Sequence, residues 1–266
     1  MKDMYQLNQI PSEAQIQKFL RRILFGKNIF CPICRYRQVW KSRDRYWCCR
    51  CRRRFSLLSH TWLGNIKLPL TKWWLVLWCW TSQIPVKQAM ALSGLSELAI
   101  RHWYDRFRKH LPENQHILER IVQLDEAYGK GWSLVMAKQP KSRKVAYVIL
   151  PERSVDRQDA VRFLEQYVKP GSKLHTDGAM MYRGIERWWP VKHGTDIHAK
   201  WEFGKTSEIE GTFGNMRTFI RRMYHHVTAE KMPDYMREFA VRFSSPEMFK
   251  NPRYYLQKSL TLAPTC

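Results

Sequence analysis

Two Cys-x-x-Cys pairs lie close together near the N-terminus of the chain, at Cys31/Cys34 and Cys48/Cys51. Four thiolates presented by two such tight turns suit tetrahedral Zn²⁺, which favours sulfur ligands. The short stretch between the pairs has room only for a hairpin. The sequence therefore predicts a zinc ribbon over residues 31–60 with these four cysteines as ligands of a structural Zn²⁺. The alternative is a cluster of cysteines buried as small apolar side chains.

Cys49 is a further thiol beside the second pair. Assigning Cys48 as the ligand keeps the two-residue spacing of the first pair, and leaves Cys49 packed or partly exposed. The chain has 7 cysteines and no apolar signal segment after its first residues. An odd number without a secretion signal favours metal binding over disulfides.

The charge balance of the chain favours a polyanionic partner. Lys and Arg number 46 against 23 Asp and Glu, a formal net charge of +23. Nucleic acid fits such an excess, because Lys and Arg that neutralise phosphates release counterions. An anionic membrane is the rival partner, but the longest charge-free apolar stretch, residues 73–86, is too short to span a bilayer. We expect DNA as the partner and a cytoplasmic, nucleoid-associated protein without a membrane segment.

The predicted ribbon carries much of this charge. Between residues 35 and 54 a single acidic residue, Asp44, stands among nine basic ones, namely Arg35, Arg37, Lys41, Arg43, Arg45, Arg50, Arg52, Arg53 and Arg54. A run of charge is often only a solvated face. On a hairpin held by a metal it predicts nucleic-acid contact instead, and we assign Arg52, Arg53 and Arg54 to DNA binding.

On both sides of the predicted ribbon, apolar residues recur at the spacing of a helix. A short helix is expected within residues 1–30, ending at Gly26, and another over residues 70–78. Residues 86–92, a turn at Gly94 and residues 96–111 have the dimensions of a helix-turn-helix within a region spanning 61–115. Its second helix is expected to expose polar side chains to a DNA groove, namely Glu97, Arg101, His102, Asp105, Arg108 and Lys109.

The pattern changes at about residue 120. Strands are expected at residues 121–125, 132–138, 144–150, 173–177 and, more weakly, 190–196, with helices at 159–168, 207–223 and 232–243. Three strands, a helix, a strand and a later helix is the order of an RNase H-like α/β fold. We place this catalytic domain at 116–250 and a tail at 251–266.

Three carboxylates stand out by position in this second region. Asp125 and Asp177 are expected to close neighbouring strands, and Glu210 lies near the start of a helix. Read singly, each would be an ordinary surface acid. Together they can hold two Mg²⁺ or Mn²⁺ ions, as in-line phosphoryl transfer requires. Arg217 and Arg221 continue the Glu210 face of the helix and would contact DNA phosphates.

At this point the chain resembles transposases of bacterial insertion sequences that join a zinc ribbon and helix-turn-helix to a DDE domain, the ISXO-like group. The resemblance runs from about Cys31 to Phe243. Its motifs here are Cys-Pro-Ile-Cys at 31–34, Cys-Cys-Arg-Cys at 48–51, Asp125-Glu126, Thr176-Asp177-Gly178, Ile209-Glu210-Gly211 and Glu238-Phe239 with Arg242-Phe243.

The resemblance implies that Asp125, Asp177 and Glu210 bind the catalytic metals and that Arg217 contacts DNA. It also implies terminal inverted repeats as the cognate DNA, a separate target DNA, and a homodimer or higher multimer that pairs two element ends. The stretch Thr206-Ser207-Glu208-Ile209-Glu210 departs from the group's pattern. Glu208 therefore competes for the third ligand position. We prefer Glu210, because Arg217 follows it at the spacing at which the group has a basic residue.

Two other functions compete with DNA strand transfer. The chain would be a DNA-binding regulator if its acidic site were only structural, and all three acids are intact. It would be a nuclease on RNA or junctions if it cut without joining. The predicted helix-turn-helix favours duplex DNA, since A-form RNA hides its major groove from a helix.

Overall fold

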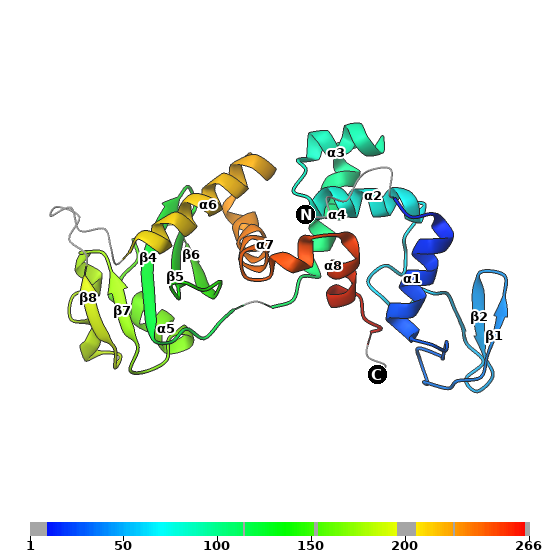
Figure 1. Ribbon diagram of the computed structural model, residues 1–266, viewed down its shortest axis with the longest axis horizontal. Helices are drawn as coiled ribbons and strands as arrows, with labels where there is room; N and C mark the ends of the chain where they lie inside the picture. Colours follow the sequence, from blue (N-terminus) through cyan, green and yellow to red (C-terminus); the bar gives the residue numbers. More distant parts are fainter. Residues whose placement is uncertain (1–9, 114, 152–153, 196–205, 226, 264–266) are drawn as a thin grey trace. The chain divides into compact units, whose positions relative to one another are not determined.

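The computed structural model is of mixed α/β class and describes residues 10–113, 115–151, 154–195, 206–225 and 227–263 (Figure 1). The chain forms two compact units. The first consists of Met1–His110 together with Glu247–Cys266, and the second is Leu111–Pro246. Each unit has its own core and is described in turn. No helix in the described ranges is long and apolar enough to cross a membrane.

A small antiparallel sheet follows the first cysteine pair. Its strands lie in the order β1 (Val39–Ser42), β2 (Arg45–Cys48) and β3 (Arg54–Phe55). Trp40 pairs with Trp47, and Trp47 pairs with Arg54. Side chains alternate between the two faces of a sheet. The other face carries Tyr46, whose ring stacks on that of Phe55 at 5.4 Å between centroids.

Helix α1 (Glu13–Phe25) precedes this sheet and has both of its ends encoded locally. Ser12 and Gln15 form a capping box at its start, and Gly26 ends it at a φ of 67°. A positive φ of this size favours glycine, which has no Cβ to clash with the backbone. The Glu13 carboxylate accepts hydrogen bonds from the Leu70 and Thr71 amides, at 3.1 and 3.2 Å. It thereby caps the next helix, α2 (Leu70–Thr81).

The core of the first unit is aromatic. Helix α2 buries Trp73, Trp74 and Trp80, and α3 (Val86–Ser93) ends at Gly94, whose backbone is left-handed. Ser96 caps the start of helix α4 (Glu97–Lys109). Its hydroxyl oxygen accepts a hydrogen bond from the Ala99 amide at 3.3 Å. In the stretch for which the sequence predicts a tail lies α8 (Pro252–Ser259). Its Tyr255 hydroxyl donates to the Phe107 carbonyl of α4 at 2.8 Å.

The second unit is built on a five-stranded sheet in the order β6-β5-β4-β7-β8. The strands are β4 (Ile121–Gly129), β5 (Trp132–Lys138), β6 (Val145–Pro151), β7 (Lys173–Thr176) and β8 (Lys192–Thr195). Pairing is antiparallel from β6 through β5 to β4, and parallel from β4 through β7 to β8. Helix α5 (Arg157–Tyr167) buries Phe163 and Leu164 in a core with Val122, Leu124 and Leu174.

Two further helices complete this unit, α6 (Ser207–Met223) and α7 (Met232–Ser244). The carboxylate of Glu238 in α7 is fully buried. It accepts a hydrogen bond from the Tyr224 hydroxyl at 2.6 Å and pairs with Arg242 at 2.8 Å. The Glu-Phe…Arg-Phe motif is thus a buried ion pair in the core. Short 3-10 helices lie at Met180–Tyr182, Ile185–Arg187, Ala229–Lys231 and Pro246–Phe249.

Strand β4 corrects one expectation from the sequence. Asp125 does not close the strand, because β4 continues to Gly129 while it pairs with β5. On its other side the ladder with β7 ends at the pair Gln123 and His175. Asp125 therefore lies within a strand but just beyond the last β7 pair, and Asp177 directly follows β7 in sequence. Of the two strands that pair with β4, β5 continues beside it past Asp125, and only the pairing with β7 ends before that residue.

Candidate functional site

The first candidate site is the group of four cysteines. The Sγ atoms of Cys31, Cys34, Cys48 and Cys51 all lie within 4.8 Å of one another. Two of the separations are 3.6 Å, between Cys31 and Cys51, and 3.5 Å, between Cys34 and Cys48. Tetrahedral Zn²⁺ with Zn–S bonds of about 2.3 Å requires sulfur atoms roughly 3.8 Å apart. The residues therefore fit a zinc ion, and Cys49 is exposed outside the group.

The two cysteine turns have the same backbone form. Arg35 donates its amide to the Cys31 carbonyl at 2.9 Å, and Arg52 donates its amide to the Cys48 carbonyl at 3.0 Å. Both arginines have a left-handed backbone, with φ of 59° and 56°. Each lies four residues after the first cysteine of its turn, which identifies Cys48 as the counterpart of Cys31.

The second candidate site is acidic. Carboxylate oxygens of Asp125, Glu126 and Asp177 lie within 4.8 Å of one another, and all three side chains are half-buried. The sequence pointed to Asp125 and Asp177 but treated Glu126 only as a neighbour. Hard cations such as Mg²⁺ take carboxylate oxygens as ligands, so this donor set fits a divalent ion. The end of the β4–β7 ladder brings the acids together.

Glu126 is the most perturbed of these acids. Burial, followed by the charges of Asp177 and Asp125, raises its pKa to about 7, although the hydrogen bond from Tyr182 opposes the shift. The fully buried Tyr182 hydroxyl donates to the Glu126 carboxylate at 2.5 Å. Like charges in a desolvated site favour a bound proton or a bound cation. The acidic group is therefore electrostatically suited to a cation.

The turn after β7 is held by neighbouring polar groups. The Asp177 carboxylate accepts the Ala179 amide at 3.1 Å. The Thr176 hydroxyl donates to the Asp177 carbonyl at 2.8 Å and lies 2.9 Å from Nε2 of His193. Burial lowers the pKa of His193, which favours its neutral form. These contacts fix the backbone that presents Asp177 to the other two acids.

Glu208 and Glu210 occupy different environments at the start of α6. Glu208 pairs with Lys138 of β5 and accepts the Lys141 amide at 3.1 Å. Glu210 is exposed and accepts a hydrogen bond from the Thr206 hydroxyl at 3.0 Å. Within the described part of the chain, Glu210 does not belong to the group of three acids. The structure thus brings together two of the three predicted carboxylates.

A hydrogen bond between β4 and α6 nevertheless places Glu210 on the relevant side of the sheet. The Ile209 amide donates to the Gln123 side-chain carbonyl at 2.9 Å. Gln123 and Asp125 are two residues apart on one strand and so share a face of the sheet. Glu210 directly follows Ile209 in the first turn of α6, so this turn lies over the face of the sheet to which Asp125 belongs.

The predicted DNA-binding arginines are exposed at most positions. Arg217 and Arg221 follow Glu210 along the exposed face of α6, and Arg52, Arg53 and Arg54 are exposed in the ribbon. Arg101 is exposed but pairs with Glu97 at 2.7 Å. The expected exposure of Arg108 is wrong, because its side chain is 1% exposed and pairs with Asp105 at 2.5 Å. Helix α4 turns this residue toward the aromatic core.

Comparisons with known proteins place the acidic group within a described domain. Residues 117–244 match the family described as the ISXO2-like transposase domain. A chain from Halobacterium salinarum (strain ATCC 700922 / JCM 11081 / NRC-1), described as an uncharacterized protein in transposable element ISH50, is 20% identical over 284 residues. That alignment covers 94% of this chain and 96% of the relative.

Among solved structures, the chain is similar to one in the cryo-EM structure of the simian T-cell lymphotropic virus intasome in complex with PP2A regulatory subunit B56 gamma. The identity is 13%, the TM-score is 0.35, and the similarity covers 63% of this chain and 67% of that chain.

Proposed function

This chain is an insertion-sequence transposase of the ISXO-like group, and on that premise we propose that it cuts and joins DNA at the ends of its element. Its substrates are the terminal inverted repeats of the element and a target DNA. The observation that carries this proposal is the group Asp125, Glu126 and Asp177, which lies inside the region that matches the transposase domain.

The catalytic domain, which we place at residues 116–250, is an RNase H-like domain. Supporting this is the strand order β6-β5-β4-β7-β8 with three antiparallel strands followed by two parallel ones. The helix α5 enters between β6 and β7, as a crossover to a parallel strand requires. The remaining proposed parts are the N-terminal helix at 1–30, the ribbon at 31–60, the helix-turn-helix at 61–115 and the tail at 251–266.

The metal-binding residues of the DDE site are Asp125, Asp177 and Glu210. Glu210 is preferred to Glu208, because Lys138 and the Lys141 amide already engage Glu208. To join the other acids, the Glu210 side chain has to leave the Thr206 hydroxyl and turn toward Asp125. Glu126 lies with the two aspartates and, held by Tyr182, adds negative charge to the same site.

The reaction has two steps of phosphoryl transfer. Two Mg²⁺ or Mn²⁺ ions, when bound, would activate the attacking oxygen and stabilise the leaving oxygen. In the first step a water oxygen bonds to phosphorus at the element end, and the bond to the 3′-oxygen breaks to give a 3′-OH. In the second step this 3′-OH attacks a phosphorus of the target DNA, and a target 3′-OH leaves. Arg217 and Arg221 hold the phosphates beside the cut.

DNA binding involves both units: Arg217 and Arg221 of α6 act from the second unit, and the ribbon and α4 act from the first. Arg52, Arg53 and Arg54 of the zinc-bound ribbon contact phosphates, and Arg101 of α4 acts from the helix-turn-helix. Supporting these roles are the exposure of all four side chains and the net charge of +23. The protein works as a homodimer or higher multimer that pairs two element ends. We place it in the cytoplasm, associated with the nucleoid.

A strand-joining assay on inverted-repeat DNA tests the proposal. We expect Asp125→Asn, Asp177→Asn and Glu210→Gln each to lower Mg²⁺-dependent joining by at least roughly 100-fold, since loss of outer-shell partners of a ligand alone costs 10- to 100-fold. Glu165→Gln on the exposed face of α5 is the matched control, and is expected to keep the activity. Unchanged joining in all three variants would overturn the assignment. Duplex binding by an unaltered chain that never joins DNA would favour a regulator instead.

A further inference from the structure

The ribbon sheet has an exposed face on which three side chains form a row across its strands. Trp40 of β1 lies opposite Trp47 of β2, and Trp47 lies opposite Arg54 of β3. Directly opposed residues project from the same face of a sheet. Trp40 is 73% exposed, and Arg54 is also exposed. A large aromatic side chain left so open on a small sheet has no role in the core of the ribbon.

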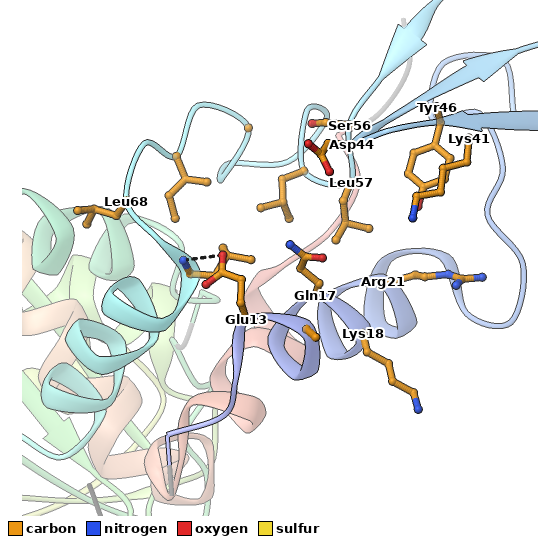
Figure 2. A pocket seen from close by; sticks show the side chains of 15 residues that line it. Glu13, Gln17, Lys18, Arg21, Lys41, Asp44, Tyr46, Ser56, Leu57 and Leu68 are labelled. Atoms are coloured by element: carbon orange, nitrogen blue, oxygen red, sulfur yellow. Dashed lines mark hydrogen bonds between the residues drawn. The ribbon is translucent and has the colours of Figure 1, made fainter. Parts of the chain in front are cut away.

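The opposite face of the same sheet is turned toward α1. Lys41 and Tyr46 belong to this face and line, with Arg21 of α1, a groove of about 560 Å³ (Figure 2). The Phe55 ring also belongs to it and lies 6.5 Å from the ring of Phe25 in α1. Because successive side chains alternate, the row of Trp40, Trp47 and Arg54 points away from α1.

The charges around this row indicate which kind of molecule it can bind. The Arg54 guanidinium lies over the Trp47 ring at 5.3 Å from the centroid. Arg45 is exposed on the same face, two residues before Trp47. Residues 35–54 carry nine basic residues and one acidic residue. Flat aromatic rings beside exposed cations are complementary to nucleobases beside phosphates.

We propose that this face, defined by Trp40, Trp47, Arg45 and Arg54, binds unpaired bases of single-stranded DNA. Trp40 stacks on a base, Trp47 extends the platform, and the two arginines contact the flanking phosphates. Bases within a duplex have both faces covered by their neighbours, so only an unpaired base offers a free face to an indole on a sheet surface. The inference rests on the proposed DNA function and adds the strand state that the ribbon recognises.

The test compares single-stranded and duplex binding by the full-length zinc-loaded protein. The probes are a fluorescein-labelled thymidine oligonucleotide and a duplex of the same length, measured by anisotropy at fixed salt. We expect Trp40→Ala to weaken single-stranded binding by roughly 5- to 150-fold, the range for losing one stacked base. Duplex affinity is expected to stay within twofold, and Trp40→Phe is expected to keep most of the single-stranded affinity.

Two further variants separate stacking from charge and folding. Tyr254→Ala removes another exposed aromatic residue of the same unit and is expected to change neither affinity. Arg54→Gln is expected to weaken both probes, because both carry phosphates. Unchanged single-stranded affinity in Trp40→Ala, or an equal loss on both probes, would overturn the inference. Strand joining by the unaltered chain is measured separately, so that failure of the proposed function is distinguishable from failure of the stacking site.

Discussion

At the level of single residues, spacing and burial together favour Cys48 over Cys49 as the candidate metal ligand. Cys48 is buried within the sulfur group, whereas its neighbour Cys49 is exposed. The paired turns that place Arg35 and Arg52 in the same conformation repeat the geometry around Cys31 and Cys48. A shift of register to Cys49 would break this repeat.

We therefore predict that Cys48→Ser loses stoichiometric zinc and that Cys49→Ser retains it. Three thiolates cannot complete a tetrahedral structural site, whereas Cys49 is outside the site. Zinc content of the purified proteins, measured by atomic emission, checks the prediction. Full zinc loading of Cys48→Ser, or zinc loss in Cys49→Ser, would show that the ligands are assigned wrongly.

Glu126 gives a second prediction at this scale, on pH. Its pKa is raised to about 7 in the folded chain, above the ordinary value of 4.5, with burial as the largest cause. An acid with a raised pKa binds its proton more tightly when folded, so its ionisation destabilises the native state as pH rises. Without divalent metal, stability should therefore fall between about pH 4.5 and 7 because of this group.

Glu126→Gln should remove that part of the pH dependence, since an amide keeps the shape and does not ionise. Thermal melts of metal-free protein at pH 5 and pH 8 measure it: the variant is expected to gain stability relative to the unaltered chain at pH 8 but not at pH 5. Added Mg²⁺ should narrow the difference at pH 8. An equal effect of the substitution at both pH values would contradict the electrostatic cause.

At the level of secondary-structure elements, helix α6 combines an acid, two cations and an exposed glycine on one face. Gly214 lies one turn after Glu210 and one turn before Arg217, and nothing lies within 4 Å of a Cβ built on it. Glycine within a helix costs roughly 0.5–1 kcal/mol relative to alanine. We predict that Gly214→Ala raises the free energy of unfolding by about that amount in urea denaturation.

Gly171 supplies a matched control in the same unit. Its Cβ would also meet nothing within 4 Å, but its φ is +82°. Alanine there should destabilise the protein by about 1 kcal/mol, because a side chain disfavours this backbone conformation. Both substitutions place a methyl group in open space. If the free energy of unfolding rises in one variant and falls in the other, the cause is backbone conformation and not packing. Destabilisation by Gly214→Ala would contradict a helical backbone at this position.

The elements show where sequence patterns suffice and where partners decide. Local signals at Ser12, Gly26 and Ser96 set helix ends, and the apolar periodicity of residues 207–223 matches α6 in full. The length of β4 was not predictable in this way, because pairing with β5 continues past Asp125. The burial of Arg108 depends on which side of α4 meets the aromatic core, and its neighbour Asp105 compensates its charge.

In the acidic site, too, the sequence pattern predicts some of the residues, and contacts with other elements decide the rest. Positions at the ends of predicted strands pointed to Asp125 and Asp177, which the parallel pairing of β4 and β7 brings together. The sequence pattern does not place Glu126 in this site, because strict alternation turns it to the face of the sheet opposite Asp125. The Tyr182 hydroxyl, from the short 3-10 helix Met180–Tyr182, donates a hydrogen bond to the Glu126 carboxylate and holds it beside the two aspartates. No periodicity in the sequence marks that contact.

At the level of the whole molecule, the two candidate sites belong to different compact units. The four cysteines lie within Met1–His110, and the three acids within Leu111–Pro246, which contains the whole region matching the transposase domain. The ribbon has only three short strands, and we expect a bound zinc ion to stabilise it. The five-stranded sheet buries its own core of leucines, valines and aromatic residues.

Removal of zinc should therefore unfold the ribbon and leave the second unit, Leu111–Pro246, folded. Hydrogen exchange of the full chain, measured by mass spectrometry with and without a zinc-selective chelator in excess Mg²⁺, separates the two regions. We expect peptides covering residues 31–55 to lose protection by at least about tenfold in exchange rate, because apo metal sites of this size are unfolded. Peptides from β4, β5 and α5 should keep their rates. Cys48→Ser should reproduce the pattern without chelator. Equal loss of protection in the sheet would mean that the units fold as one, and a ribbon that stays protected would mean that zinc does not hold it.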